Sequence, residues 1–156
     1  MELYLVQHGE AKPESEDPSR PLTDKGRRET EAVARVAARL GLSLNKIFHS
    51  GKLRARQTAE IMAEHLKPSG GVSEASGLAP LDSPEKAMEL IEAEGGGVMI
   101  CGHLPHLSRL VALLTVGDHE KTVVKFRYSA IVALAREENR WAVSWMLTPE
   151  QAERLL

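Results

Sequence analysis

The chain has 156 residues, of which 42% are hydrophobic and 27% are charged, and its net charge is −2. This size and composition are typical of a soluble globular protein, so we expect residues 1–156 to form a single domain. The small negative charge argues against nucleic acid or an anionic membrane as a partner. The single cysteine, Cys101, excludes an intramolecular disulfide, and no stretch reaches the ~18 apolar residues of a membrane span. We therefore expect a cytoplasmic protein.

Short apolar runs that end near glycine or histidine alternate with amphipathic segments along the first two thirds of the chain. The runs predict buried strands, which we expect at 3–6, 47–49 and 98–101. The amphipathic segments predict helices, which we expect at 24–40, about 53–66, 84–94 and 105–114. Thr23 and Ser83 are suitable N-caps for the first and third of these helices, and Gly41 is a suitable end for the first.

The last third of the chain has a different pattern. Apolar segments predict strands at about 122–126, 130–136 and 140–147, with Asn139 in a hairpin turn between the last two. The tail from 149 to 156 predicts a short helix. Strands that alternate with helices favour an α/β fold: a three-layer sandwich with a central, mostly parallel sheet flanked by helices and one antiparallel edge.

Histidines follow two of the early strands, at the points where a parallel sheet binds its ligands. These positions are His8-Gly9 and Gly102-His103, and Arg54 follows the remaining early strand at the start of a helix. A neutral imidazole can attack phosphorus, and arginine offers a fixed fork of donors for phosphate oxygens. A second histidine can stabilise charge in the transition state. The sequence therefore predicts a phosphate-handling site built on His8, with Arg54 and His103 brought in from distant segments.

Three motifs resemble those of the histidine phosphatase superfamily, which has a phosphoglycerate mutase-like fold. Residues 7–10 (Gln-His-Gly-Glu) resemble its Arg-His-Gly signature, residues 50–59 its second motif, and residues 102–105 (Gly-His-Leu-Pro) its third. The loop element at 20–23 (Arg-Pro-Leu-Thr), the small size and the ending at 145–149 are similar to the SixA-type phosphohistidine phosphatases.

This resemblance implies a role for each matching residue. His8 would be the nucleophile that is transiently phosphorylated, Arg54 would grip the phosphate, and His103 would hydrogen-bond it and stabilise the transition state. Further phosphate contacts are expected from Arg20, Gln7 and Gly9. The resemblance also implies that no metal or cofactor is used, and that phosphate is removed from a phosphohistidine on a partner protein, such as a phosphotransfer domain or phosphocarrier.

Position 7 departs from the family pattern, because Gln7 stands where the family has arginine. A hydrogen bond to a charged group is worth about 1.5–3 kcal/mol. Its loss would cost roughly one to two decades in binding or rate, which Arg20 or Arg56 would offset in part. Three functions stay open: a working phosphatase with a modified pocket, a phosphate- or phosphoprotein-binding protein with little turnover, and a small-molecule phosphomonoesterase.

Several other residues are candidates for supporting roles. Glu10 and Asp82 are candidate general acids for the leaving group. His106 forms a His-x-x-His pair with His103, a spacing that can bind zinc, but no third ligand follows at a suggestive spacing, so a packing or pocket-wall role is favoured. Ser129 is a candidate pocket residue. The remaining histidines are expected to have structural or surface roles: His49, His65 and His119.

Overall fold

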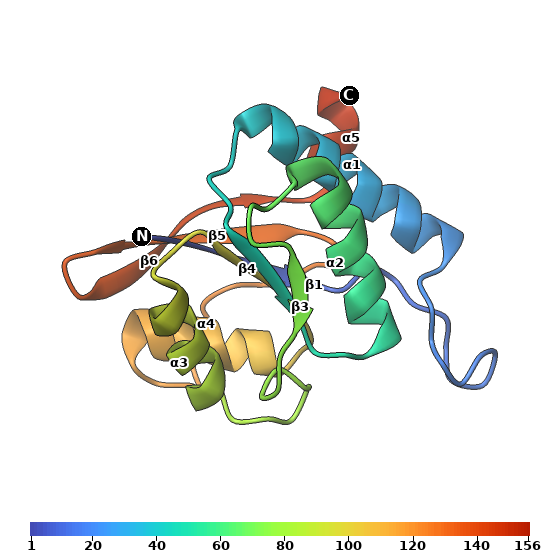
Figure 1. Cartoon of the computed structure of the whole chain (residues 1–156). Coiled ribbons are helices and arrows are strands. Elements are labelled where there is room, and N and C mark those ends of the chain that lie inside the picture. The colour runs from blue at the N-terminus through green and yellow to red at the C-terminus, as the bar shows by residue number, and fades with distance from the viewer.

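A six-stranded sheet lies between two layers of helices in the computed structural model, which describes all 156 residues (Figure 1). The strands are β1 (Glu2–Gln7), β2 (Lys46–His49), β3 (Val72–Glu74), β4 (Val98–Gly102), β5 (Ile131–Glu137) and β6 (Arg140–Leu147). The helices are α1 (Asp24–Leu40), α2 (Leu53–Leu66), α3 (Glu85–Glu94), α4 (His106–Val116) and α5 (Pro149–Leu155). No helix combines the length and the apolar character needed to cross a membrane.

The order of the strands places the expected site residues side by side. The sheet has the order β3-β2-β4-β1-β5-β6. The first four of these strands are parallel, and β5 runs antiparallel to both of its neighbours. The predicted α/β fold with a mostly parallel sheet and one antiparallel edge is therefore confirmed. Because Gln7 pairs with Gly102, the residues that follow them, His8 and His103, leave the same end of two adjacent strands.

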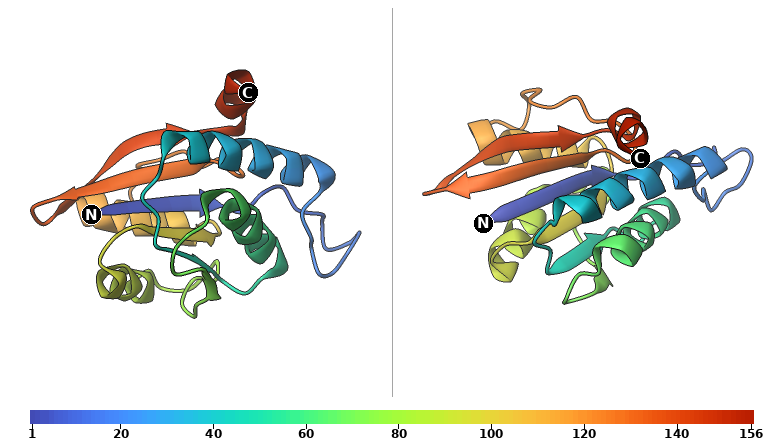
Figure 2. Two further views of the ribbon diagram at one scale, coloured as in Figure 1. Left: turned by 45° about the horizontal axis from the view of Figure 1, so that its top comes forward. Right: turned by 90° about the horizontal axis from the view of Figure 1, so that it is seen from above.

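Alternate side chains of each central strand fill two separate hydrophobic cores. In β1, Tyr4 and Val6 face the core that α1, α2 and α5 cover, whereas Leu3 and Leu5 face the core that α3 and α4 cover (Figure 2). All four side chains are buried, and the burial of one such apolar side chain contributes about 1.5–3 kcal/mol. The two cores cover the two faces of the sheet, and the expected site lies beyond the carboxyl ends of its parallel strands.

The helix ends follow the predicted caps with one exception. Thr23 accepts a hydrogen bond from the backbone N–H of Gly26 at 2.9 Å, and Gly41 ends α1 in the left-handed region at φ 69°. The predicted Ser83 cap of α3 is wrong, because Pro84 occupies the N-cap position and no side chain caps this helix. Pro84 has helical dihedral angles, which its ring favours, but no side chain accepts a hydrogen bond from the first backbone N–H groups of α3.

The strand predicted at 122–126 does not form. Residues 117–130 run from α4 to β5 without helix or strand structure. The apolar residues that suggested a strand have a different use, since Val124 and Phe126 pack against the core under α3 and α4. This segment brings Tyr128 and Ser129 to the carboxyl end of β1, where Ser129 donates its backbone N–H to the carbonyl of Gln7 at 2.9 Å.

Candidate active site

His8 is held as a neutral imidazole with a free Nε2. Its backbone N–H donates to the carbonyl of Gly102 at 2.9 Å, and its Nδ1 lies 2.7 Å from the carbonyl oxygen of Gly9. Because a carbonyl can only accept, Nδ1 carries the proton and Nε2 keeps its lone pair. Burial lowers the pKa of His8 to about 4; the bond to Gly9 opposes this shift, while Arg54 and Arg20 add to it. His8 is therefore uncharged near pH 7, as a nucleophile must be.

The turn after His8 has room for glycine alone. A Cβ atom on Gly9 would lie 2.8 Å from Oγ1 of Thr30 and 3.0 Å from Oγ of Ser129. The backbone N–H of Gly9 donates to Oγ1 of Thr58 at 2.9 Å, and that hydroxyl donates to the carbonyl of Arg54 at 2.8 Å. The first turn of α2 is thus tied directly to the loop that carries His8.

Two guanidinium groups, those of Arg54 and Arg20, lie close enough to His8 to lower its pKa. Arg54 lies in the first turn of α2, and its Nε is buried without a hydrogen-bond partner. Arg20 lies on the loop before α1, where its Nε donates to the carbonyl of Lys12 at 3.0 Å. Burial, followed by the charge of Arg20, lowers the pKa of Arg54. A buried N–H without a partner is costly unless a ligand accepts it, so the two arginines and the helix N-terminus favour an anion here.

His103 completes a group of three residues from three separate segments. It is only 1% exposed, and the centroid of its ring lies 5.2 Å from that of His8. Its Nε2 lies 2.6 Å from Oγ of Ser50, and its Nδ1 is buried without a partner. Burial, followed by the proximity of His8 and Arg54, lowers the pKa of His103 to about 3. The structure therefore brings together the three residues that the sequence singled out, with both imidazoles neutral near pH 7.

Tyr128 is a neighbour of His8 that the sequence analysis missed. Its ring centroid lies 5.5 Å from that of His8, and the residue is 37% exposed. Ser129, a candidate pocket residue, is instead fully buried behind the glycine turn, where its Oγ lies 2.8 Å from Oγ1 of Thr30. No motif marks Tyr128, because its position depends on β5 lying beside β1, and strand order is not visible in a local pattern.

Gln7 adds no charge to this group. It is the last residue of β1 and is half-buried, and its side chain makes no hydrogen bond within the protein. Of the two residues expected to compensate, Arg20 lies close enough to His8 to lower its pKa. Arg56 is exposed and is paired with Glu60 at 2.8 Å. The positive charge beside His8 thus comes from Arg54 and Arg20.

The two candidate general acids are engaged within their own loops. A carboxylate oxygen of Glu10 accepts a hydrogen bond from Oγ1 of Thr23 at 2.9 Å, and Lys25 lies 4.0 Å from the other oxygen. A carboxylate oxygen of Asp82 accepts the backbone N–H of Ala79 at 2.9 Å. These contacts direct the Glu10 carboxylate to the start of α1 and the Asp82 carboxylate to its own turn.

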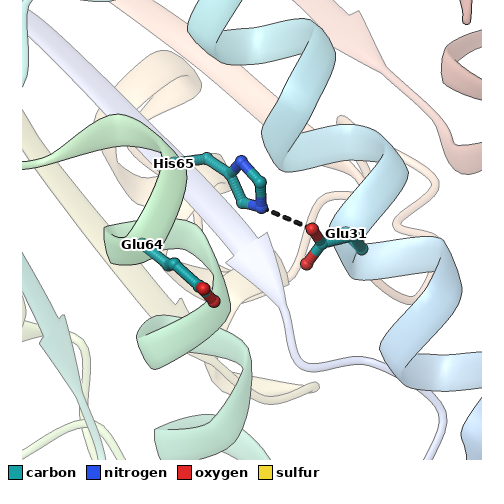
Figure 3. A group of neighbouring side chains, drawn as sticks. All are labelled: Glu31, Glu64 and His65. Atoms are coloured by element: carbon teal, nitrogen blue, oxygen red, sulfur yellow. Dashed lines mark hydrogen bonds and ion pairs between the residues drawn. The ribbon is translucent and has the colours of Figure 1, made fainter.

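The group of side chains that could hold a metal ion lies at the other end of α2 from Arg54. It consists of Glu31, Glu64 and His65, whose ligand atoms lie within 4.8 Å of one another (Figure 3). His65, which was expected to be a simple surface residue, links α2 to α1 through a 2.6 Å contact between its Nε2 and Glu31.

His106 is fully buried and belongs to no such group. His49 accepts the backbone N–H of Gly51 at 3.0 Å, which agrees with a structural role.

Comparisons with known proteins identify the family to which the sequence is similar. The family model of the histidine phosphatase superfamily (branch 1) matches residues 3–79. An uncharacterized protein of Picosynechococcus sp. is 38% identical over 126 residues, which cover 76% of this chain and 75% of the relative. Phosphohistidine phosphatase SixA of Escherichia coli is 27% identical over 155 residues, which cover 96% of this chain and 94% of SixA.

A solved structure extends the likeness to three dimensions. The structure of the protein histidine phosphatase SixA complexed with tungstate superposes with a TM-score of 0.84 at 27% identity, over 96% of this chain and 97% of that one. The similarity in sequence and in structure supports a phosphatase, and hence a hydrolase. This chain belongs to the histidine phosphatase superfamily.

Proposed function

We propose that this protein removes phosphate from a phosphohistidine of a partner protein, such as a phosphotransfer domain or phosphocarrier, without a metal ion. The reaction passes through a phosphohistidine formed on His8. The observation that carries this proposal is the pairing of a neutral His8, whose Nε2 is free, with the unpartnered guanidinium Nε of Arg54. A nucleophile and an anion-binding group are thereby placed together before the substrate arrives.

The reaction has two steps. Nε2 of His8 forms a bond to phosphorus while the bond between phosphorus and the substrate nitrogen breaks, and the leaving imidazole takes a proton from solvent. Water then attacks phosphorus, the bond to Nε2 breaks, and inorganic phosphate leaves with neutral His8 restored. Arg54, Arg20 and His103 hold the phosphoryl oxygens throughout, and the side chain of Gln7 adds a hydrogen bond. The backbone N–H of Gly9, which was also expected to bind phosphate, donates to Thr58 instead.

The nature of the leaving group supports a phosphohistidine rather than a phosphate ester. An alkoxide leaving group needs a general acid, whereas an imidazole needs less help. Glu10 and Asp82, the two carboxylates considered for that role, are held by hydrogen bonds within their own loops. The apolar residues Leu104 and Tyr128 are partly exposed next to His103 and His8, which suits a protein surface as the substrate. The similarity to SixA, a phosphohistidine phosphatase, supports the same substrate chemistry.

The alternative is a phosphate- or phosphoprotein-binding protein with little turnover. The observation that favours it is Gln7, which leaves the site one charge short of the family pattern. A small-molecule phosphomonoesterase has less support, because it would need the general acid that Glu10 and Asp82 are poorly placed to supply.

Phosphate release from two probes separates these functions. The probes are a peptide that carries phosphohistidine and the alkyl phosphate ester phosphoserine, whose alkoxide leaving group needs a general acid. We expect wild-type protein to act mainly on the first, and His8→Ala and Arg54→Ala to lose at least about a hundredfold in kcat/KM. The matched controls His119→Ala and Arg35→Ala change exposed residues outside the site and should retain full activity. If wild type and His8→Ala release phosphate equally slowly while wild type still binds inorganic phosphate, the binding function is the correct one.

A further inference from the structure

We propose that Ser50 is a positioning residue that holds His103 in the neutral tautomer with its proton on Nδ1, so that His103 donates this proton to a phosphoryl oxygen. The role deepens the function proposed above and rests on the same site. Ser50 itself touches neither the phosphate nor His8. It acts through the ring of His103, which it contacts directly.

The hydrogen bonds around Ser50 favour one direction for the bond between its hydroxyl group and His103. Oγ of Ser50 lies 2.6 Å from Nε2 of His103, and the backbone N–H of Lys52 donates to the same Oγ at 3.3 Å. The N–H of Lys52 uses one lone pair of this oxygen, and the structure gives the hydroxyl proton of Ser50 no other acceptor, so we assign this proton to Nε2 of His103. An Nε2 that accepts is unprotonated, and a neutral imidazole must then carry its proton on Nδ1.

The proton on Nδ1 of His103 lacks an acceptor within the protein. This atom is buried, and no hydrogen-bond partner lies within reach. A buried N–H without a partner is unfavourable, so the arrangement is most stable when a ligand oxygen accepts it. The proposed phosphoryl group on His8 supplies such an oxygen, because the two rings lie 5.2 Å apart between centroids.

The two histidines are thereby fixed for opposite tasks. The carbonyl of Gly9 accepts a hydrogen bond from Nδ1 of His8, which keeps the proton on Nδ1 and a lone pair on Nε2. The hydroxyl group of Ser50 donates a hydrogen bond to Nε2 of His103, which keeps the proton of this ring on Nδ1. One ring therefore offers a nucleophile and the other a donor, although both are neutral imidazoles.

The charges near His103 make a neutral donor necessary. The groups that face it are His8 after β1, Lys52 and Arg54 at the start of α2, and His106 in α4, and none of them is acidic. Burial and these neighbours hold the pKa of His103 at about 3. Near pH 7 an imidazolium is therefore scarce, and His103 can donate from Nδ1 only in the tautomer that Ser50 selects.

The test compares Ser50→Ala, the hydroxyl-retaining Ser50→Thr, and Ser69→Ala, which changes an exposed serine at 69 in the loop after α2. The measurement is kcat/KM on the phosphohistidine peptide between about pH 5 and 8. We expect Ser50→Ala to be about tenfold slower than wild type near pH 8. This deficit should stay nearly constant down to about pH 5, because a His103 with a pKa of about 3 remains neutral over this range and still depends on its tautomer. Ser50→Thr should regain most of the rate. A Ser50→Ala variant as fast as wild type, a deficit that disappears by pH 5, or a Ser50→Thr variant as slow as Ser50→Ala would overturn the proposal.

A second measurement reads the tautomer without any turnover. Nitrogen-15 NMR of labelled histidine distinguishes protonated from unprotonated ring nitrogens. In wild type we expect His103 to be protonated on Nδ1 and not on Nε2, and Ser50→Ala to shift protonation toward Nε2. A wild-type His103 that is protonated on Nε2 refutes the role of Ser50, whatever the activity. If the expected tautomer is found in a protein that releases no phosphate, the proposed phosphatase function fails and the role of Ser50 stands.

Discussion

Replacement of His8 by glutamine should change how the stability of the protein depends on pH. Glutamine is close in size to histidine but does not titrate. The pKa of His8 falls from 6.5 to about 4 in the folded protein, mainly because the ring is buried. At about 1.36 kcal/mol for each pH unit, this difference amounts to about 3 kcal/mol. That is a large part of the 5–15 kcal/mol that typically separates folded from unfolded domains.

The sign follows from which state binds the proton first. Above about pH 6.5, His8 is neutral in both the folded and the unfolded state, so its titration does not change the free energy of unfolding. As the pH falls from 6.5 toward about 4, the unfolded chain takes up a proton that the folded protein refuses, so wild type loses up to about 1.36 kcal/mol per pH unit through this group. Below about pH 4 the folded protein also binds the proton and the loss levels off. The His8→Gln variant should lack this component.

Urea denaturation followed by tryptophan fluorescence measures the free energies of unfolding. The difference between wild type and His8→Gln should shift in favour of the variant by about 3 kcal/mol on going from pH 7 to 4. Contributions of His49 and His106, whose pKa values are also lowered by burial, cancel in this difference. The exposed His119→Gln serves as the control. A wild-type-minus-variant difference that is constant with pH would show that His8 is not held neutral, and the argument for a free Nε2 nucleophile would fail.

Three further substitutions test other parts of the site and its support. Gln7→Arg should raise kcat/KM on the phosphohistidine peptide by roughly one to two decades; an unchanged rate would mean that position 7 does not reach the phosphate. Gly9→Ala should lower the free energy of unfolding by about 1–3 kcal/mol, since its Cβ would lie 2.8 Å from Oγ1 of Thr30; an unaffected thermal melt would contradict the close packing. Glu29→Gln should lower Tm by several degrees, through a loss of about 1–3 kcal/mol, because Glu29 is 6% exposed and pairs with Arg127; a Tm within error of wild type would show that this pair adds no stability.

The elements that the sequence predicted are those whose signals are local. The apolar run before His8 and the Thr23 and Gly41 caps are read from neighbouring residues, and the strand and helix formed as expected. The strand predicted at 122–126 failed because apolar side chains also serve a loop that packs on a core. Val124 and Phe126 do this against the side of the sheet that α3 and α4 cover.

The meeting of His8, Arg54 and His103 could be anticipated because parallel strands present their carboxyl ends at one edge of the sheet. The position of Tyr128 could not, since it depends on the partner of β1 on its other side. β5 runs antiparallel to β1, and Ile131 at its start pairs with Val6 near the end of β1. The loop that precedes β5 is therefore delivered to His8, a consequence of long-range pairing that no short motif encodes.

The substitution at position 7 changes the balance between binding and turnover more than it changes the identity of the proposed site. Arg54 and Arg20 supply two positive charges next to two neutral imidazoles, which is enough to balance a phosphoryl group that carries two negative charges. A third cation would bind substrate, intermediate and inorganic phosphate more tightly at once, and such uniform binding lowers KM without raising kcat. The kinetics of Gln7→Arg therefore distinguish two effects. A fall in KM at constant kcat would mean that an arginine at position 7 serves binding alone, whereas a rise in kcat would mean that it stabilises charge that develops only in the transition state.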